Sequence, residues 1–189
     1  MKTVPVQQVV PPYRAVMWYK VLGIVSLCSV YVSTQGSNLQ CKIAGGGELI
    51  PIRTPEYRAW VPLGEVGLNV SDSKVLIFAA RSCFGAHILL QNNAEDFKNA
   101  VYEIVIGGMK NTRSGIRQCV GCKFDEWVKD KALNCRFFNY FWISWCGDEV
   151  WVGHGYRPPH NRILRYKYEN QHVINAASVR SESDTYWAL

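Results

Sequence analysis

Short apolar runs recur along the chain from about residue 74, and each run ends at a group of Gly, Asn, Asp or Pro residues. The runs are rich in β-branched and aromatic residues: KVLIFAA, GAHILL, VYEIVIG, RFFNYFWISW, EVWVG, ILRYKY and HVINAASV. This rhythm of short strands and turns is typical of antiparallel sandwiches and barrels. We therefore predict an all-β fold, an antiparallel β-sandwich of the jelly-roll type with at most short helical turns.

The remaining segments carry weaker patterns. NAEDFKNAV (93–101) and DEWVKDKAL (125–133) can each form a helical turn or two, but both are too short for the crossover of a βαβ unit. The stretch CKIAGGGELIPIRTPEYRAW is rich in glycine and proline and shows no periodicity. We expect an irregular lead-in over residues 37–56 and one domain over residues 57–189, because 189 residues are marginal for two domains.

The segment YEIVIGGMKNTRSGIR (102–117) is predicted to form a hairpin with GGMKN as its turn. In that register Glu103 lies opposite Gly115, and Arg113 and Arg117 lie diagonally across from Glu103 on the same face. The two arginines then have two possible roles. They form an exposed charge ladder with Glu103, or they bind an anionic ligand.

A second hairpin is predicted in FWISWCGDEVWVG, where Gly147-Asp148 suits the central positions of a type II′ turn. This turn pairs Cys146 with Glu149. One face of the hairpin is then apolar and faces the core: Ile143, Trp145, Val150 and Val152. The other face is aromatic and amphipathic: Tyr140, Trp142, Ser144 and Trp151. Either a loop covers these aromatics, or they lie open and bind a sugar ring or a partner protein.

The first 36 residues differ from the rest of the chain. Residues 21–32, VLGIVSLCSVYV, are an uninterrupted apolar run of signal-peptide length, and Thr34 and Gly36 suit the −3 and −1 positions of a cleavage site. We expect residues 1–36 to be a signal peptide, either with an extended n-region or with its true start at Met17. The alternative is an uncleaved membrane anchor, for which ~20 apolar residues are normally needed.

Removal of this leader changes both the charge and the cysteine count. The net charge of +6 falls to +3 because the leader holds three basic residues and no acidic one, which is too little to indicate nucleic-acid binding. Cys28 leaves with it, and the remaining even set is predicted to form disulfides in an oxidising compartment: Cys41, Cys83, Cys119, Cys122, Cys135 and Cys146. Asn69 begins a glycosylation sequon, Asn-Val-Ser, which fits the same export route.

CVGC at 119–122 has two other interpretations. A zinc site would combine its two cysteines with Cys135 and Cys146, but their spacing does not match a zinc ribbon. A thioredoxin-like redox pair needs a βαβ context, which the pattern lacks. Structural disulfides are the interpretation that the export signal favours, and their pairing stays open.

The two hairpin sequences, with VWVGHG after them, resemble the farnesoic acid O-methyltransferase-like domain family. The resemblance covers about residues 57–189, and Met109 stands where the family often has tryptophan. The family name implies methyl transfer from S-adenosylmethionine to the carboxylate of farnesoic acid. Members also occur as extracellular interaction or lectin-like modules, so the resemblance implies two different functions.

The methyl transfer itself requires only positioning, because a carboxylate is already ionised at pH 7. Arg113 or Arg117 would hold the acid. The cofactor would need a glycine-rich loop between a strand and a helix, and the one candidate, IAGGGEL (43–49), follows no clear strand and opens no clear helix. S-adenosylmethionine is also a cytosolic cofactor, which conflicts with export.

The histidines give no catalytic or metal motif, and we expect surface or loop structural roles for them. We therefore expect a secreted, non-enzymatic recognition module with no cofactor and no metal. Its partner is expected to be an extracellular glycan or protein, with no stable membrane insertion after cleavage. The alternative is an S-adenosylmethionine-dependent O-methyltransferase acting on a farnesoic-acid-like carboxylate.

Overall fold

The computed structural model describes residues 31–33, 40–44, 49–57, 59–97, 101–168 and 172–189, and of residues 31–33 and 40–42 it describes the backbone only. Its strands are β1 (Tyr31–Ser33), β2 (Gln40–Ala44), β3 (Pro51–Thr54), β4 (Val61–Pro62), β5 (Val75–Arg81), β6 (Ala86–Gln91), β7 (Tyr102–Gly107), β8 (Arg113–Arg117), β9 (Glu126–Lys129), β10 (Asn139–Ser144), β11 (Glu149–His154), β12 (Arg162–Lys167), β13 (Ala176–Ser181) and β14 (Thr185–Ala188). The described helical turns are η1 (Leu63–Val66) and α1 (Gly108–Asn111).

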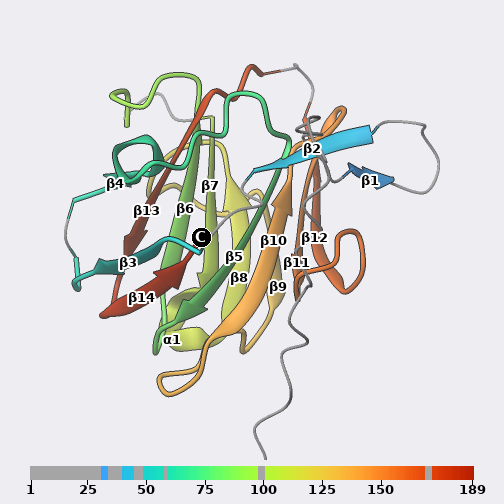
Figure 1. Cartoon of the computed structure of the whole chain (residues 1–189). Helices are drawn as coiled ribbons and strands as arrows, with labels where there is room; N and C mark the ends of the chain where they lie inside the picture. Colours follow the sequence, from blue (N-terminus) through green and yellow to red (C-terminus); the bar gives the residue numbers. More distant parts are fainter. Residues whose placement is uncertain (1–30, 34–39, 45–48, 58, 98–100, 169–171) are drawn as a thin grey trace, which may run out of the picture.

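The strands form two sheets (Figure 1). The eight-stranded sheet has the order β1-β2-β5-β10-β11-β12, with β14 paired both to β5 and to β3. The six-stranded sheet has the order β4-β13-β6-β7-β8-β9. Among the described pairs, β2 with β5 is parallel and the others are antiparallel. The predicted antiparallel β-sandwich with short helical turns is confirmed.

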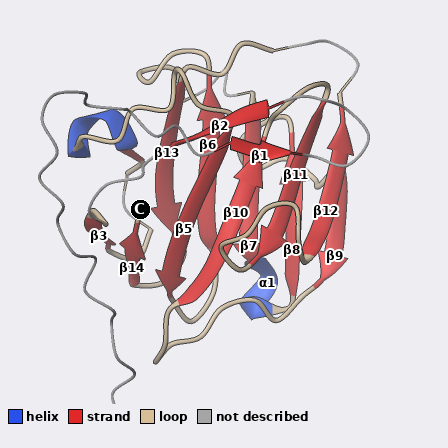
Figure 2. Cartoon of the chain, turned by 45° about the vertical axis from the view of Figure 1, so that its right-hand side comes forward, coloured by secondary structure: helices blue, strands red, loops and turns tan. Residues whose placement is uncertain are grey.

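The core lies between the two sheets, which Figure 2 shows as layers one behind the other. Side chains alternate along each strand, so every second residue points inward. Inward residues of β5 and β7 are fully buried: Leu76, Phe78, Ala80, Tyr102, Ile104 and Ile106. Burial of each large apolar side chain stabilises the fold by ~1.5–3 kcal/mol.

The second hairpin has the predicted register. Ile143 lies opposite Val152 and Ser144 opposite Trp151 in the pairing of β10 with β11. Gly147 has a φ of +85°, the positive value that the first central position of a type II′ turn requires. The predicted core face of this hairpin is buried: Ile143, Trp145, Val150 and Val152.

The first hairpin has a different register from the one predicted. Glu103 lies opposite Arg117 instead of Gly115, a shift of two residues. The turn is longer on its C-terminal side because Met109, Lys110 and Asn111 all have left-handed φ values of 52–61°. Asn111 is fixed there by tertiary contacts, since its amide donates to the carbonyl of Leu133 and its Oδ1 accepts the Leu133 N–H.

Two other expectations were wrong. The segment 37–56, expected to be irregular, contains β2 and β3. Within the stretch 125–133, residues Glu126–Lys129 form the edge strand β9, paired with β8, and no helical turn is present. Most of the predicted leader lies outside the described residues, and residues 31–33 within it form β1, which pairs with β2.

Candidate functional site

The aromatic face of the second hairpin lies on the outer face of the eight-stranded sheet, and its three candidate residues have different environments. Trp142 is fully buried, Trp151 is half-buried and Tyr140 is 45% exposed. Both outcomes foreseen for this face, cover by a loop and open exposure, therefore occur side by side.

Trp142 packs under the loop that joins β11 to β12. Its indole N–H donates to the carbonyl of His160 at 2.9 Å. Gly153 lies opposite it, and a Cβ at this glycine would stand 2.3 Å from the indole ring, so the sheet makes room for the tryptophan there. The ring presents no surface to a ligand, which removes Trp142 from the predicted binding residues.

Trp151 is covered by charged side chains rather than by a loop. The guanidinium of Arg162 lies 4.7 Å from its ring centre, and its indole N–H donates to Glu149. Glu149 also pairs with Arg165, and this hydrogen bond lowers the pKa of the carboxyl. Trp151 is therefore partly accessible beside three charged groups.

Tyr140 forms an open aromatic pair with Tyr156, which is 57% exposed. The ring centres are 5.9 Å apart and the rings meet edge to face at 72°. Arg157 lies 5.2 Å over the second ring. Tyr140 stands on strand β10 and Tyr156 on the loop that joins β11 to β12, so the pair offers an aromatic surface with one ring anchored on the sheet.

A second feature of the same face is an alternating row of cations and rings, here called the arginine–aromatic row: Arg53, Tyr186, Arg81 and Phe138. Tyr186 on β14 lies directly opposite Arg53 on β3 and opposite Arg81 on β5. Their neighbours Ile52, Trp187 and Ala80 belong to the core, so the row faces outward.

The contacts in the row are short. The Arg81 guanidinium lies 4.3 Å from the ring centre of Tyr186 and 5.5 Å from that of Phe138. Arg53 lies 5.6 Å from the Tyr186 ring and forms an ion pair with Asp184 at 2.8 Å. Among the residues the structure describes, no carboxylate lies within ion-pair distance of Arg81. The row was missed at the sequence level because all four of its residues lie outside the segments taken for hairpins.

Arginine stacking is frequent throughout the described chain. In eight described contacts the guanidinium lies less than 6 Å from a ring centre, the range in which a cation is attracted to the face of a ring. One of them involves Arg113, which lies 4.3 Å over the ring of Trp127. Both residues are on the six-stranded sheet, so this predicted site residue is not near Tyr140.

Arg117 is committed to a buried charge cluster. Its Nε donates to Glu103 at 2.7 Å, and Glu103 is fully buried. The same carboxylate contacts His87 Nδ1 at 2.6 Å and accepts the backbone N–H of Gly121 at 2.9 Å. Arg180 approaches it at 3.6 Å. The predicted exposed charge ladder is therefore wrong, because residues 118–125 cover this part of the outer face.

The cluster sets the charge states of its members. Burial alone would raise the pKa of Glu103, but the hydrogen bonds from His87, Arg117 and Gly121 lower it to about 2. Burial opposes the charged form of His87, yet its bonds to Glu103 and Glu182 raise its pKa above the ordinary value. His87 is thus a buried strand histidine on the outer face of the six-stranded sheet, contrary to the surface or loop role expected for it.

His154 forms a second polar chain. Its Nε2 lies 3.2 Å from Asp130, whose other oxygen accepts the hydroxyl of Ser114 at 2.7 Å. Because the carboxylate stands between the two, the imidazole does not contact the hydroxyl and does not activate it as a nucleophile.

Two disulfides are described, Cys83–Cys135 and Cys119–Cys122. Cys146 is disulfide-bonded as well, and the side chain of Cys41 lies outside the described residues. A zinc site on these sulfurs is excluded by the bonds they already form. The 119–122 pair lies between two strands, β8 and β9, which is not the context of a thioredoxin motif.

Two predicted features remain. Asn69 is exposed, and its Oδ1 accepts the N–H of Ser71 within a turn, a position accessible to glycosylation.

The glycine run of IAGGGEL follows β2, contrary to the expectation that no strand precedes it. The chain enters β3 at Pro51, so in the described part the run leads to a strand and not to a helix.

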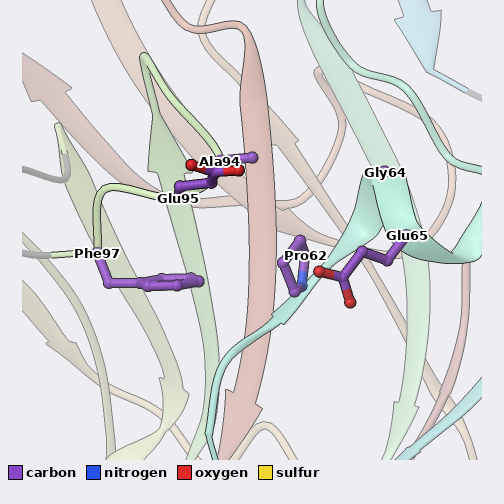
Figure 3. Close-up of a pocket in the computed structure, with 6 residues that line it drawn as sticks. All are labelled: Pro62, Gly64, Glu65, Ala94, Glu95 and Phe97. Carbon is purple, nitrogen blue, oxygen red and sulfur yellow. The ribbon is translucent and has the colours of Figure 1, made fainter.

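A shallow hollow of about 400 Å³ lies near the edge strand β4. Figure 3 shows Phe97 and Pro62 facing each other across it, with Glu65 beside the proline. Glu95 adds a second carboxylate from the segment after β6. Within the described ranges, no group of three or more His, Cys, Asp or Glu side chains is placed to hold a metal ion. In the described part of the chain, no helix is long and apolar enough to cross a bilayer.

Comparison with known proteins gives one kind of match in sequence and another in structure. "Uncharacterized protein 5" of Haliotis asinina is 99% identical over 173 residues, which cover 92% of this chain and all of that protein. A β-1,3-1,4-glucanase (lichenase) from a mouse hindgut metagenome has a TM-score of 0.43 at 7% identity, covering 82% of this chain and 86% of its own. A native glycosidic hydrolase has a TM-score of 0.45 at 8% identity, covering 82% and 83%.

The hairpins described above fall within the match to a family model. The farnesoic acid O-methyltransferase model matches residues 55–186, from the segment after β3 to the outward tyrosine of β14. More than half of the sequence is included. The chain therefore belongs to the farnesoic acid O-methyltransferase family.

Proposed function

We propose that this chain is a secreted, non-enzymatic recognition module that binds an extracellular glycan or protein through the outer face of its eight-stranded sheet. The observation that carries this proposal is the selective exposure of aromatics on that face. Trp142 is buried under a loop, whereas Tyr140 and Tyr156 stay about half exposed as a preorganised pair. An exposed ring held on a strand, as Tyr140 is, can bind a sugar ring or a partner surface with little loss of conformational entropy.

Export is supported by the apolar run in residues 1–36 and by the disulfides, which persist in oxidising compartments. Intact-mass analysis of protein secreted from animal cells is expected to give a chain that begins at Ser37 with no free thiol. Retention in the cells with reduced cysteines would contradict both parts of this proposal.

Binding is tested on a glycan array and on intact cells, with wild-type protein, Tyr140→Ala and Tyr156→Ala. Both variants are expected to lose binding and to keep the parent stability within ~0.5 kcal/mol, as for exposed positions. Trp127→Ala is the matched control, because Trp127 is 48% exposed but lies on the other sheet. Equal loss of binding in the control, or no binding by the wild type on either surface, would overturn the proposal.

The competing function is S-adenosylmethionine-dependent methylation of a farnesoic-acid-like carboxylate, which the family description favours. Arg113 is the better of the two arginines for holding that acid, because Arg117 is bound to Glu103. Calorimetry with S-adenosylmethionine at ~1 μM to 1 mM, the range of enzyme affinities, is expected to show no heat. Saturable binding would favour the methyltransferase.

A further inference from the structure

We infer that the arginine–aromatic row is a subsite for an acidic polysaccharide, in which Arg81 binds a carboxylate or sulfate group of the sugar chain. The inference rests on the proposed function and specifies the class of ligand that the outer face recognises.

Among the described residues, Arg81 is one of several arginines that have no carboxylate within ion-pair distance. Its guanidinium is held by the rings of Tyr186 and Phe138, 4.3 and 5.5 Å from their centres. Stacking fixes the plane of an arginine while its N–H groups remain able to donate, and this planar fork fits a carboxylate or sulfate with two parallel hydrogen bonds. Within the described part of the chain, the nearby Asp184 is already neutralised by Arg53.

The order of the row favours a sugar chain over other anionic partners. Neighbouring strands are ~4.8 Å apart, so arginines and rings each recur every ~10 Å across the sheet. Acidic polysaccharides offer the same alternation, with apolar C–H faces of the sugar rings between charged groups. A lipid surface would instead require one continuous apolar patch with cations around it, and within the row Arg81 stands between the exposed rings of Tyr186 and Phe138.

The rings have the exposure that this role requires. Tyr186 is 38% exposed and Phe138 is 43% exposed, so each offers area to a sugar ring while still holding the arginine. Tyr140 follows Phe138 two residues later on the same face, which extends the subsite toward the Tyr140–Tyr156 pair.

The test measures binding of the purified mature chain to immobilised alginate, dextran sulfate and neutral dextran. Wild-type protein is expected to bind at least one acidic polymer and to bind dextran at least about tenfold more weakly. Binding to alginate alone would show that Arg81 recognises a carboxylate, and binding to dextran sulfate alone would show that it recognises a sulfate. Binding to both polymers would show that it recognises either anionic group. Binding is also expected to weaken as salt is raised, because an exposed charge contact is screened.

Variants locate the contact. Arg81→Gln is expected to raise the Kd about tenfold or more, and Arg81→Lys is expected to recover only part of this, since lysine keeps the charge but loses the fork. Arg113→Gln is the matched control, because Arg113 stacks on Trp127 at the same 4.3 Å but on the other sheet. Its Kd is expected to change less than about twofold. All variants should melt within about 2 °C of the parent.

Several results would overturn the inference. Equal binding of dextran and the acidic polymers would mean that the chain recognises sugars without regard to charge. The proposed function would then stand, and the acidic polysaccharide as its ligand would be rejected. Equal loss of binding in Arg81→Gln and Arg113→Gln would remove Arg81 as the contact. Tighter binding to polyglutamate, phosphatidylserine vesicles or single-stranded DNA would assign the row to another partner. Failure of every polymer, together with a blank array and blank cells, would reject the proposed function as well.

Discussion

Replacement of Glu103 by glutamine removes the one negative charge that His87 and Arg117 share inside the fold, while the side chain keeps its size. The pKa of Glu103 is lowered from 4.5 to about 2, and at 1.36 kcal/mol per pH unit this difference stabilises the folded chain by about 3 kcal/mol at neutral pH. Breaking a buried pair by removing one partner typically costs ~3–5 kcal/mol, in agreement with that value. For a chain of this size we expect a melting temperature lower by roughly 10 °C.

The pH dependence follows from the directions of the two pKa shifts. The folded pKa of Glu103 lies below its unfolded value, so its stabilisation is present above about pH 4.5 and is lost as the pH falls toward 2. The pKa of His87 is raised, so its contribution is present below about pH 6.5 and is lost as the pH rises through the folded pKa. The gap between wild type and Glu103→Gln should therefore be largest between about pH 4.5 and 6.5.

Thermal unfolding followed by circular dichroism from pH 3 to 8 measures this gap. Glu126→Gln is the control, because Glu126 is an exposed carboxylate on β9, and it should melt within about 2 °C of the parent. The reasoning would be refuted by a Glu103→Gln variant that melts with the parent at pH 6. A gap that stays constant down to pH 3 would refute it equally.

Three further outcomes are expected from denaturant titrations. Trp142→Ala should lower the free energy of unfolding by ~3–5 kcal/mol, whereas the half-buried Trp151→Ala should lower it clearly less; equal losses would mean that both rings are core. Gly153→Ala should cost ~1–3 kcal/mol through its clash with the indole and should become nearly neutral in the Trp142→Ala background, which a double-mutant cycle measures. Replacing Cys83 and Cys135 together by serine should cost about 4 kcal/mol, because their disulfide closes a loop of 52 residues; an unchanged midpoint would contradict this.

Local turn chemistry explains which hairpin register was predictable. Gly147 selects a two-residue turn by its positive φ, and with the turn fixed every pair of β10 and β11 follows. The first hairpin has no such local signal. Its turn is held by Asn111 bonding to the backbone of Leu133, 22 residues away, so tertiary contacts and not the turn residues set its register.

The charge cluster was missed for a related reason. Alternation in YEIVIG correctly placed Glu103 on the face opposite the core, and an outer face normally means solvent. Here the loop of the Cys119–Cys122 disulfide folds over that face, and the N–H of Gly121 reaches the carboxylate. Sequence showed which face Glu103 occupies but not what covers that face.

The candidate binding face was predictable in part. The second hairpin identified Tyr140 as an outward aromatic, whereas three residues of the arginine–aromatic row beside it come from β3, β5 and β14, segments far apart in the sequence. Arg53, Arg81 and Tyr186 come together only because of the order of the strands in the sheet, and no local sequence pattern predicts that order.

The position of β14 has a consequence for how the chain reaches its folded state. Among the described strands, β3 is joined to the eight-stranded sheet through β14, and the Trp187 indole donates to Thr54 across 133 residues of sequence. A chain emerging from the ribosome or a translocation pore therefore makes β3 long before its pairing partner exists. Closing so long a loop is slow, and β3 and the adjoining edge of β5 stay unpaired until then. The period before β14 emerges is thus when the nascent chain is most exposed to aggregation and most dependent on chaperones.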